Sequence, residues 1–486
     1  MNSHVIDDSG ADATRSSIEV HAIDHIPASE RRGRVWQQAP FWFASNFLLP
    51  SLVVGFIGPL GGLGFGWTTL AIVLGSAIGT LFMALHASQG STLGLPQLIQ
   101  SRAQFGTHGV IFALLVTVAI YVCGNVFDVA TTTQEMRAVV GSGPSWPWAV
   151  GIVMIQGAIA VCGFDWICRV ERWLTYVIII PFIALTFGFI AVIGPSHVFL
   201  MGTFNRTVFF SQLAAAALYL VSYVVYVSDY TRYLPATTPP RRLLFAVFLG
   251  PFVSSVWLLA LGALFASTLK NGATLTSALT AGDMIVPGFG TAIMLLAAIA
   301  QVVVMPLNTY GASLAALTAV DGFHPIRSSL RIRVSATLGL SGLILLIALA
   351  APSANQGAFN EFLSLITYFV VPWSVINLVD YYWLRRRKYS VVDLLSSKGI
   401  YGRWSWRGLA AQAAGLVAMI PFIALPSFTG SAARALGGVD VSLLTGALTA
   451  GLVYYALRRS DRSQQRGALV SRGPDTPESR RLPEPS

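Results

Sequence analysis

The chain has 486 residues, of which 54% are apolar and only 11% are charged. Soluble globular proteins carry about 25% charged residues, so this composition excludes a large soluble enzyme, an extracellular scaffold and a nucleic-acid binder, and it favours a protein embedded in a lipid bilayer. The net charge of +10 then bears mainly on which side of the bilayer the Lys and Arg residues occupy. The three cysteines lie in or beside apolar runs, which favours packed thiols over disulfides: Cys123, Cys162 and Cys168.

The chain divides into three regions. Residues 1–34 are polar and acidic and are predicted to form a disordered tail, 35–457 to form a membrane domain, and 458–486 to form a second solvated tail. A spanning helix takes about 20 mostly apolar residues, and the middle region offers twelve such runs. These are 37–60, 66–88, 108–131, 147–164, 173–194, 208–231, 242–267, 288–319, 331–351, 360–382, 408–427 and 439–457. The fold class is therefore an all-α integral membrane protein of about twelve transmembrane helices.

The distribution of basic residues predicts the orientation of the chain. If twelve crossings follow one another, 27 of the 31 Lys and Arg residues share the face of the two tails. Basic residues collect in cytoplasmic loops, so both tails are predicted to be cytoplasmic in a multi-pass protein of the cell membrane. The four exceptions are Arg137, Arg206, Lys270 and Arg434.

Polar residues inside the first and third runs predict a cavity. Asn46 is followed by Pro50 in a stretch prone to unwinding, and unwound backbone at membrane depth survives only where protein or water satisfies it. In the third run Tyr121, Asn125 and Asp128 are spaced by four and three, so they share one helical face that suits a small planar polar ligand. Hydrogen bonding that merely joins helices remains an alternative for this face.

The sixth and eighth runs carry further polar groups. Ser222 and Tyr223 lie near the middle of the sixth run, and Asp229 and Arg232 at its end are placed to pair with each other or with neighbouring loops, in a structural or gating role. In the eighth run a proline at 306 loosens the helix. Gln301 and Asn308 lie two turns apart there, and an amide offers both donors and an acceptor to a nucleobase. Core packing remains an alternative for Gln301.

No enzyme or metal signature accompanies these residues. His86, His108, His197 and His324 lie at span ends or in loops, and no pair among them has the spacing of metal ligands. The glycine-rich stretch at 58–66 follows a helical run rather than a strand, which argues against a phosphate-binding loop. The sequence therefore predicts neither a catalytic centre nor a metal or cofactor, and movement of a solute across the bilayer is the remaining function.

Four segments give the chain a resemblance to the nucleobase:cation symporter-1 family, the purine and cytosine permeases. They are GLPQLIQSRAQFG at 94–106, SDYTRYLP at 228–235, NTYG at 308–311, and 369–389, which contains PWSVINLVDYYWLRRRKY. The first contains Arg102, to which we assign a structural or gating role together with Asp229 and Arg232. Because the matches follow one another in order, the resemblance covers essentially the whole membrane domain.

The resemblance implies a LeuT-like fold, in which spans one to five and six to ten form an inverted repeat and two helices follow. Its ligand lies near the midplane between spans one, three, six and eight, and a bundle rocks against a scaffold to give alternating access. Tyr223 matches the position of an aromatic ring that stacks on the base. Asn308 and Asn46 match amides of helices eight and one.

Departures from the family pattern concern the ligand and the coupling ion. Helix three of the family commonly supplies a second aromatic ring, where this chain has Gly124 and Asn125, and run six has no Gly or Pro to break it. Sodium-coupled relatives use helix-eight hydroxyls, yet no Ser or Thr occurs between Met294 and Leu307, so the proton is favoured over sodium. Asp128 is the candidate carrier because burial favours a neutral carboxyl, although a position at the outer, water-filled mouth is an alternative.

These observations predict a proton-coupled importer of a nucleobase, purine or cytosine, with the nucleobase, the proton and the lipid bilayer as partners and no nucleic acid. Two alternatives stay open. The same fold carries another small heterocycle, such as allantoin, a hydantoin, thiamine or pyridoxine, or the protein is a passive uniporter or channel for a small polar solute.

Overall fold

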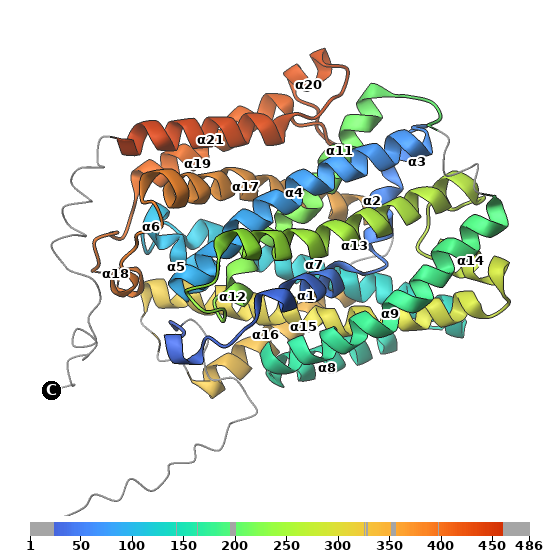
Figure 1. Ribbon diagram of the computed structural model, residues 1–486, viewed down its shortest axis with the longest axis horizontal. Coiled ribbons are helices and arrows are strands. Elements are labelled where there is room, and N and C mark those ends of the chain that lie inside the picture. Colours follow the sequence, from blue (N-terminus) through green and yellow to red (C-terminus); the bar gives the residue numbers. More distant parts are fainter. Residues whose placement is uncertain are drawn as a thin grey trace, which may run out of the picture.

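The computed structural model describes residues 24–141, 143–162, 164–194, 201–324, 326, 329–350, 356–396 and 398–459. Most of the predicted tails, 1–34 and 458–486, and the side chain of Cys168 lie outside these residues. All named secondary-structure elements of the described part are helices, and one isolated β-bridge joins Ala424 and Thr429. Its helices lie side by side as one bundle (Figure 1). We call the end of the bundle that holds residues 24 and 459 the terminal side, and the other end the far side.

Each of the twelve apolar runs corresponds to helix. Eight described helical stretches have the length and hydropathy to cross a bilayer by themselves, and runs one, four, eleven and twelve correspond to shorter, interrupted or less apolar helices. In chain order the helices of the runs are α1 (Gln38–Asn46), α2 (Ser51–Gly55) and α3 (Ile57–Leu60); α4 (Phe65–Leu93); α7 (Ile111–Val140); α8 (Trp146–Cys162); α9 (Phe164–Ile193); α11 (Arg206–Val221), η3 (Ser222–Val225) and α12 (Val227–Thr231); α13 (Pro240–Thr268); α15 (Phe289–Phe323); α16 (Leu330–Ala350); α17 (Gln356–Leu378) and η5 (Val379–Leu384); α19 (Trp406–Met419) and η6 (Ile420–Phe422); and α21 (Ser442–Arg459).

Short helices lie between the crossings. On the terminal side these are η1 (Ala28–Glu30), η2 (Val35–Gln37), α5 (Gln97–Gln100), α6 (Arg102–Phe105) and α18 (Val391–Leu395), and on the far side α14 (Ser277–Ile285) and α20 (Ser431–Ala435). The sequence did not predict α14, because the segment after 267 lacks a long apolar run.

Helix α7 is longer than the sequence predicted. The third apolar run ends at 131, whereas α7 continues to Val140. The added turns carry two threonines, Gln134 and Glu135, which lower the hydropathy, yet all of these except Gln134 are buried. Burial of polar side chains within the bundle, rather than contact with lipid, explains why hydropathy alone gave a boundary that was too early.

Helix contacts reveal an internal two-fold relation between the first five crossings and the next five. The interrupted first crossing packs on α13, the second helix of the second half, and the interrupted sixth crossing packs on α4, the second helix of the first half. The third helices of the halves, α7 and α15, pack on each other, as do the fourth helices, α8 and α16. A rotation that exchanges the halves therefore preserves this set of contacts, as in an inverted-repeat transporter fold.

Glycines bring the interrupted crossings close to α13 and α4. A methyl group at Gly250 or Gly262 of α13 would collide with the backbone of Ala39 or Leu52 in the first crossing. Gly75 and Gly79 of α4 in the same way lie against backbone carbonyls of α11, those of Leu213 and Ala217. Small residues of this kind let helices in a membrane approach to backbone contact, so these four crossings form one tightly joined group.

A strap formed by residues 24–34 covers the terminal side. The Ile26 amide donates to the Gly94 carbonyl at 3.0 Å, and the Gly33 amide donates to the Tyr233 carbonyl at 3.0 Å. Arg31 is buried and donates to the carbonyls of Ile26, at 2.8 Å, and Ser91, at 3.1 Å. The described end of the region predicted to be a tail thus packs on the ends of α4 and of the sixth crossing.

Candidate functional site

The first crossing is interrupted halfway through the bundle. Helix α1 ends at Asn46, Phe47 has non-helical backbone angles (φ −89°, ψ 71°), and α2 begins at Ser51. Pro50 has no amide hydrogen and so cannot continue the α1 hydrogen-bond ladder. The Ser51 hydroxyl donates to the Asn46 carbonyl at 3.2 Å, which satisfies an acceptor that the interruption leaves without its helical donor.

The sixth crossing is interrupted as well, although it contains neither Gly nor Pro at this depth. Helix α11 gives way at Ser222 to one turn of 3₁₀-helix, and Tyr226 has extended φ of −139° before α12 begins. The Ser222 hydroxyl donates to the Tyr219 carbonyl at 2.6 Å. Side-chain competition for a backbone carbonyl therefore accompanies the break that the sequence left open.

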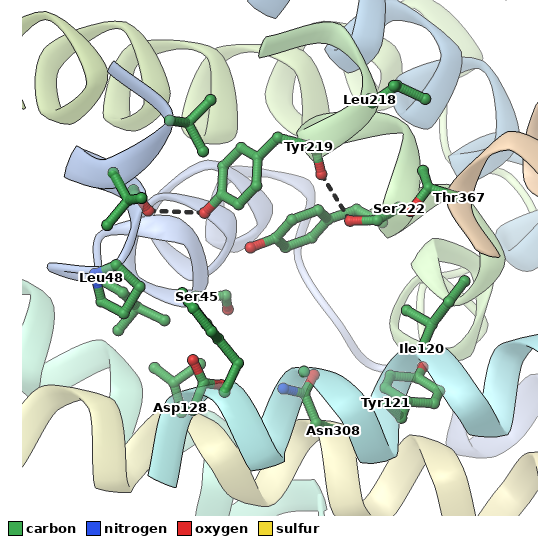
Figure 2. A pocket seen from close by; sticks show the side chains of 18 of the residues that line it. Ser45, Leu48, Ile120, Tyr121, Asp128, Leu218, Tyr219, Ser222, Asn308 and Thr367 are labelled. Carbon is green, nitrogen blue, oxygen red and sulfur yellow. Dashed lines mark hydrogen bonds between the residues drawn. The ribbon is translucent and has the colours of Figure 1, made fainter. Parts of the chain in front are cut away.

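A cavity of about 400 Å³ lies between the two interruptions, within the range of about 300 to 1,000 Å³ typical of small-molecule sites. Figure 2 shows Tyr121, Asp128 and Asn308 along one side of it, and Tyr219 and Ser222 across from them. The wall is largely apolar and aromatic. Its lining residues are Trp42, Ser45, Leu48, Pro50, Ser51, Val53, Val54, Ile57, Ile120, Tyr121, Gly124, Phe127, Asp128, Ala215, Leu218, Tyr219, Ser222, Tyr223, Tyr226, Val304, Leu307, Asn308, Ser364 and Thr367.

Five of the eight residues predicted to bind substrate or a proton line this cavity: Tyr121, Asp128, Ser222, Tyr223 and Asn308. Asn125, Gln301 and Asn46 do not line it. The first two bond to residues that do, whereas the Asn46 amide faces α13, where it donates to Ser254 Oγ at 2.8 Å and Ser255 Oγ at 2.6 Å.

Asn125 holds the side chain of Asn308 in place. The Asn308 Nδ2 donates to Asn125 Oδ1 at 2.9 Å, while Asn125 Nδ2 donates to the Met305 carbonyl at 3.1 Å and to Thr309 Oγ1 at 2.8 Å. Asn308 Oδ1 accepts no hydrogen bond from the described residues. The amide of Asn308 is thus oriented from behind, and its oxygen is available to a donor in the cavity.

Gln301 holds Asp128 in a similar way. Its Nε2 donates to Asp128 Oδ1 at 3.1 Å and to Thr131 Oγ1 at 2.8 Å. Asp128 is 9% exposed and lines the cavity. Among the described lining residues it is the only Asp or Glu, and none of them is Lys, Arg or His. The chemistry of this wall therefore suits a neutral or cationic ligand rather than an anion.

Aromatic residues that sequence reasoning did not select complete the site. Trp42 lies 6.3 Å from Tyr223 and 6.1 Å from Tyr226 between ring centroids, and Tyr121 lies 5.1 Å from Tyr226. Tyr219 lies 5.9 Å from Tyr223, and its hydroxyl is 2.7 Å from Ser51 Oγ across the two interruptions. The spacing of Tyr219, Ser222, Tyr223 and Tyr226 along one helical face was a signal that would have found Tyr219 and Tyr226, whereas no such pattern indicated Trp42.

The cavity extends toward the far side and is closed toward the terminal side. Lining residues of the first crossing beyond its break, such as Val54 and Ile57, and of α11, such as Ala215, lie on the far side of the interruptions. On the other side the rings of Phe41, Trp42 and Tyr230 pack together, with Tyr230 5.2 Å from Phe41 and 5.3 Å from Trp42. These rings separate the cavity from the terminal side.

The three residues assigned a structural or gating role lie on the terminal side. Arg102 is 1% exposed and pairs with Asp321 at 3.0 Å; burial lowers the pKa of its guanidinium, and the hydrogen bond to Asp321 opposes that change. Asp229 Oδ1 accepts from the Gln97 amide at 2.7 Å. Arg232 donates to the Tyr310 hydroxyl at 3.4 Å. Together they tie the segment after α4 and the end of the sixth crossing to α15.

Comparison with known proteins identifies the family. Residues 25–446 match the family of permeases for cytosine/purines, uracil, thiamine and allantoin. The chain belongs to this family. The chain is 31% identical to Bacillus subtilis YxlA, whose name is that of a purine-cytosine permease, over 91% of this chain and 96% of that protein. It is 26% identical to the Saccharomyces cerevisiae purine-cytosine permease FCY2, over 90% of this chain and 85% of that protein.

The fold is that of a solved member of the same family. The transporter Mhp1, of the nucleobase-cation-symport-1 family, superposes with a TM-score of 0.73 in a closed conformation with bromovinylhydantoin bound, at 18% sequence identity, over 92% of this chain and 97% of Mhp1. The protein is therefore a multi-pass membrane transporter with a LeuT-like fold, as the sequence predicted, and it belongs to a family of permeases rather than of enzymes. In the described residues no three His, Cys, Asp or Glu side chains gather as metal ligands would.

Proposed function

We propose that the protein is a secondary active importer of a nucleobase, purine or cytosine, that it is driven by protons, and that it works by alternating access in the cytoplasmic membrane. The observation that carries the proposal is the cavity at the two helix interruptions, where aromatic rings, the Asn308 amide and the Asp128 carboxyl line one small space. Permeases of the family, including those named for purines and cytosine, are similar over nearly the whole chain.

The wall chemistry supports a flat heterocycle as the ligand. Rings such as Tyr223 provide faces on which a base stacks, a contact worth about 1 to 3 kcal/mol per base in nucleic-acid binding proteins. The Asn308 oxygen accepts from an N–H or NH₂ group of the ring, and Asp128 adds a second acceptor on the same side of the cavity (Figure 2). Hydroxyl groups of Tyr219 and Ser222 lie across from them.

The residues around Asp128 favour the proton as the coupling ion. A hard cation requires several oxygen ligands, yet α15 contributes Val304 to the cavity wall and has no hydroxyl side chain between Met294 and Leu307. The carbonyls of Val303 and Val304 are engaged within the helix. The Val302 carbonyl lacks its helical donor because Pro306 has no amide hydrogen, but one carbonyl is fewer than the several oxygens that a hard cation requires. Asp128 binds a proton without any further ligand, and it lines the cavity in which substrate binds, so that the two are able to influence each other.

The orientation predicted from the basic residues indicates the side of the membrane to which the cavity is open. With 27 of 31 basic residues on the side of the tails, the terminal side is the cytoplasmic side, and the cavity extends toward the exterior. Release into the cytoplasm then requires that the rings of Phe41, Trp42 and Tyr230 part while the far side closes, which is the alternating access expected of an inverted-repeat transporter.

Uptake by a host that lacks nucleobase transport tests the proposal. Labelled hypoxanthine or cytosine should accumulate above its outside concentration, and an uncoupler should abolish the accumulation. Uptake that ignores the uncoupler and stops at the outside concentration would identify a passive uniporter and refute symport.

One observation favours a different cargo on the same fold. Gly124 lines the cavity, and a methyl group there would lie 3.9 Å from Asn308 Nδ2, with no closer neighbour. In the family, helix three commonly supplies an aromatic ring that faces the stacked base. At Gly124 this chain has open space instead of that ring. Competition by allantoin, hydantoins, thiamine and pyridoxine in the same uptake assay distinguishes these cargoes, because strong competition by one of them with indifference to every base would replace the nucleobase.

A further inference from the structure

A second acidic side chain is buried in α7, in the turns that the hydropathy pattern left out. Glu135 has 0% of its surface exposed, and neither of its carboxyl oxygens accepts or donates a hydrogen bond to any described residue. It lies seven residues, or about 10 Å along the helix axis, beyond Asp128 toward the far side. Because the third apolar run ends at 131, hydropathy alone does not predict that Glu135 lies deep in a span.

None of the described residues near Glu135 compensates a negative charge. Gln301 of α15 bonds to Asp128 and Thr131 of α7, so continuing this antiparallel packing places Glu135 opposite the stretch 292–300 of α15. That stretch reads AIMLLAAIA and contains no polar side chain. Val139, one turn further along α7 on the same face, packs in an apolar cluster with Phe47 of the first break and Met294 of α15.

The charged and titratable groups on the surrounding helices lie elsewhere or are engaged. Helices α8, α15, α16 and α17 pack on α7, and the far-side halves of α8, α15 and α16 contain no titratable residue. On α7 itself Arg137 is exposed. Toward the far side, Glu361 of α17 accepts from the Ser427 amide at 2.8 Å, Tyr368 of α17 donates to Asp440, and Asp283 of α14 accepts from the Gly288 and Gly290 amides. The basic residues of that side, Arg206, Lys270 and Arg434, are exposed, as is Tyr176 of α9.

An ionised carboxylate without donors or a counter-ion is strongly disfavoured inside a protein, and the group neutralises instead. The neutral acid is therefore the form that this conformation holds. Phe47 belongs to the segment of the first crossing that has to move when the far side closes, and it shares the apolar cluster beside Glu135. Movement of that segment changes the surroundings of Glu135, and so links its proton to the position of the first crossing.

We propose that Glu135 is a second proton-binding site of the transport cycle, so that two protons, one on Asp128 and one on Glu135, accompany each substrate molecule. In each cycle the Glu135 carboxylate takes a proton from the exterior solution and becomes the buried neutral acid. After the first crossing moves, its O–H bond dissociates, the proton passes to water on the cytoplasmic side, and the carboxylate is regenerated. The inference rests on the proposed proton coupling and deepens it.

Equilibrium accumulation in proteoliposomes measures the proton number directly. With a pH difference and no membrane potential, the logarithm of the substrate accumulation ratio rises by one for every coupled proton per pH unit. Wild-type protein should therefore reach about 100-fold accumulation at a difference of one pH unit, and Glu135→Gln about 10-fold. Glu135→Asp should restore the wild-type ratio. The control Glu361→Gln, an acid toward the same side that lies outside the cavity wall, should not change it.

Each outcome decides between the two proposals. A wild-type ratio of about 10-fold, or a Glu135→Gln ratio equal to wild type, overturns the second proton site while leaving proton coupling intact. No accumulation by the wild-type protein overturns the proposed proton coupling itself. If Glu135→Gln does not fold, the wild-type ratio still decides, and infrared spectra of the wild type and Glu135→Asp provide a second measurement. The carbonyl band of a protonated buried carboxyl should shift between them, and identical spectra in this region would contradict the assignment.

Discussion

Replacing Tyr223 separates the contribution of its ring from that of its hydroxyl. Tyr223 lines the cavity and its ring lies 5.4 Å from Tyr226, 5.9 Å from Tyr219 and 6.3 Å from Trp42. Tyr223→Ala removes the face on which a base would stack, a loss of about 1 to 3 kcal/mol. Because about 1.4 kcal/mol corresponds to a tenfold change in Kd, the affinity should fall by about 5-fold to 150-fold.

Tyr223→Phe is the matched control, because it keeps the ring and its three aromatic neighbours and deletes only the hydroxyl. Its effect on Kd should stay below about 1 kcal/mol, the net value of one ordinary hydrogen bond. Equilibrium binding of labelled hypoxanthine or cytosine to purified protein in detergent measures both Kd values, and thermal unfolding of each variant verifies that it is folded. Equal losses in the two variants would refute stacking as the role of Tyr223, and so would unchanged binding by Tyr223→Ala.

Three further substitutions test other parts of the site. Asp128→Asn should abolish accumulation driven by a pH difference while preserving exchange of labelled for unlabelled substrate across the membrane; undiminished accumulation would contradict a proton-carrying role. Asn308→Ala should weaken binding by about tenfold or more, because it removes an acceptor from the cavity. It also leaves Asn125 Oδ1 without its donor, at a cost of about 1 to 3 kcal/mol. An unchanged Kd together with an unchanged unfolding temperature would argue against both roles. Arg102→Ala should lower the free energy of unfolding by less than the roughly 3 to 5 kcal/mol lost when a fully buried ion pair is broken, since Asp321 is 18% exposed. Thermal unfolding measures this loss, and Arg403→Ala, at an exposed arginine, is the control. Equal stability of the two variants would contradict a structural role for the Arg102–Asp321 pair.

The sequence was sufficient to predict the membrane crossings, because the bilayer imposes a simple length and hydropathy requirement on each of them. It was also sufficient for the break in the first crossing, where Pro50 removes a backbone donor. It did not determine the break in the sixth crossing, because a serine competes with a helix only when its surroundings allow it. The same limit applies to Glu135, whose burial depends on packing against α15 rather than on local hydropathy.

The sequence also did not determine, at every position, whether a side chain faces the cavity or a neighbouring helix. Asn46 directly precedes the break, yet its amide points to the serines of α13. Asn125 and Gln301 were chosen as ligand-binding residues, and the structure places them behind Asn308 and Asp128, which they hold. Spacing identified the correct faces of α7 and α15, but only the packed structure distinguishes a residue that lines a cavity from one that supports it.

The close glycine contacts of α4 and α13 restrict which helices are able to move against one another. Where α13 and α4 meet the interrupted crossings, backbone lies against backbone at Gly250, Gly262, Gly75 and Gly79, and such surfaces interlock too closely to shear. Helices α7 and α15 meet the interrupted crossings largely through the side chains of the cavity wall. We therefore expect the movement of the proposed alternating access to occur along the cavity rather than at the glycine contacts, so that the compartment proposed to hold the cargo would also be the joint of the molecule.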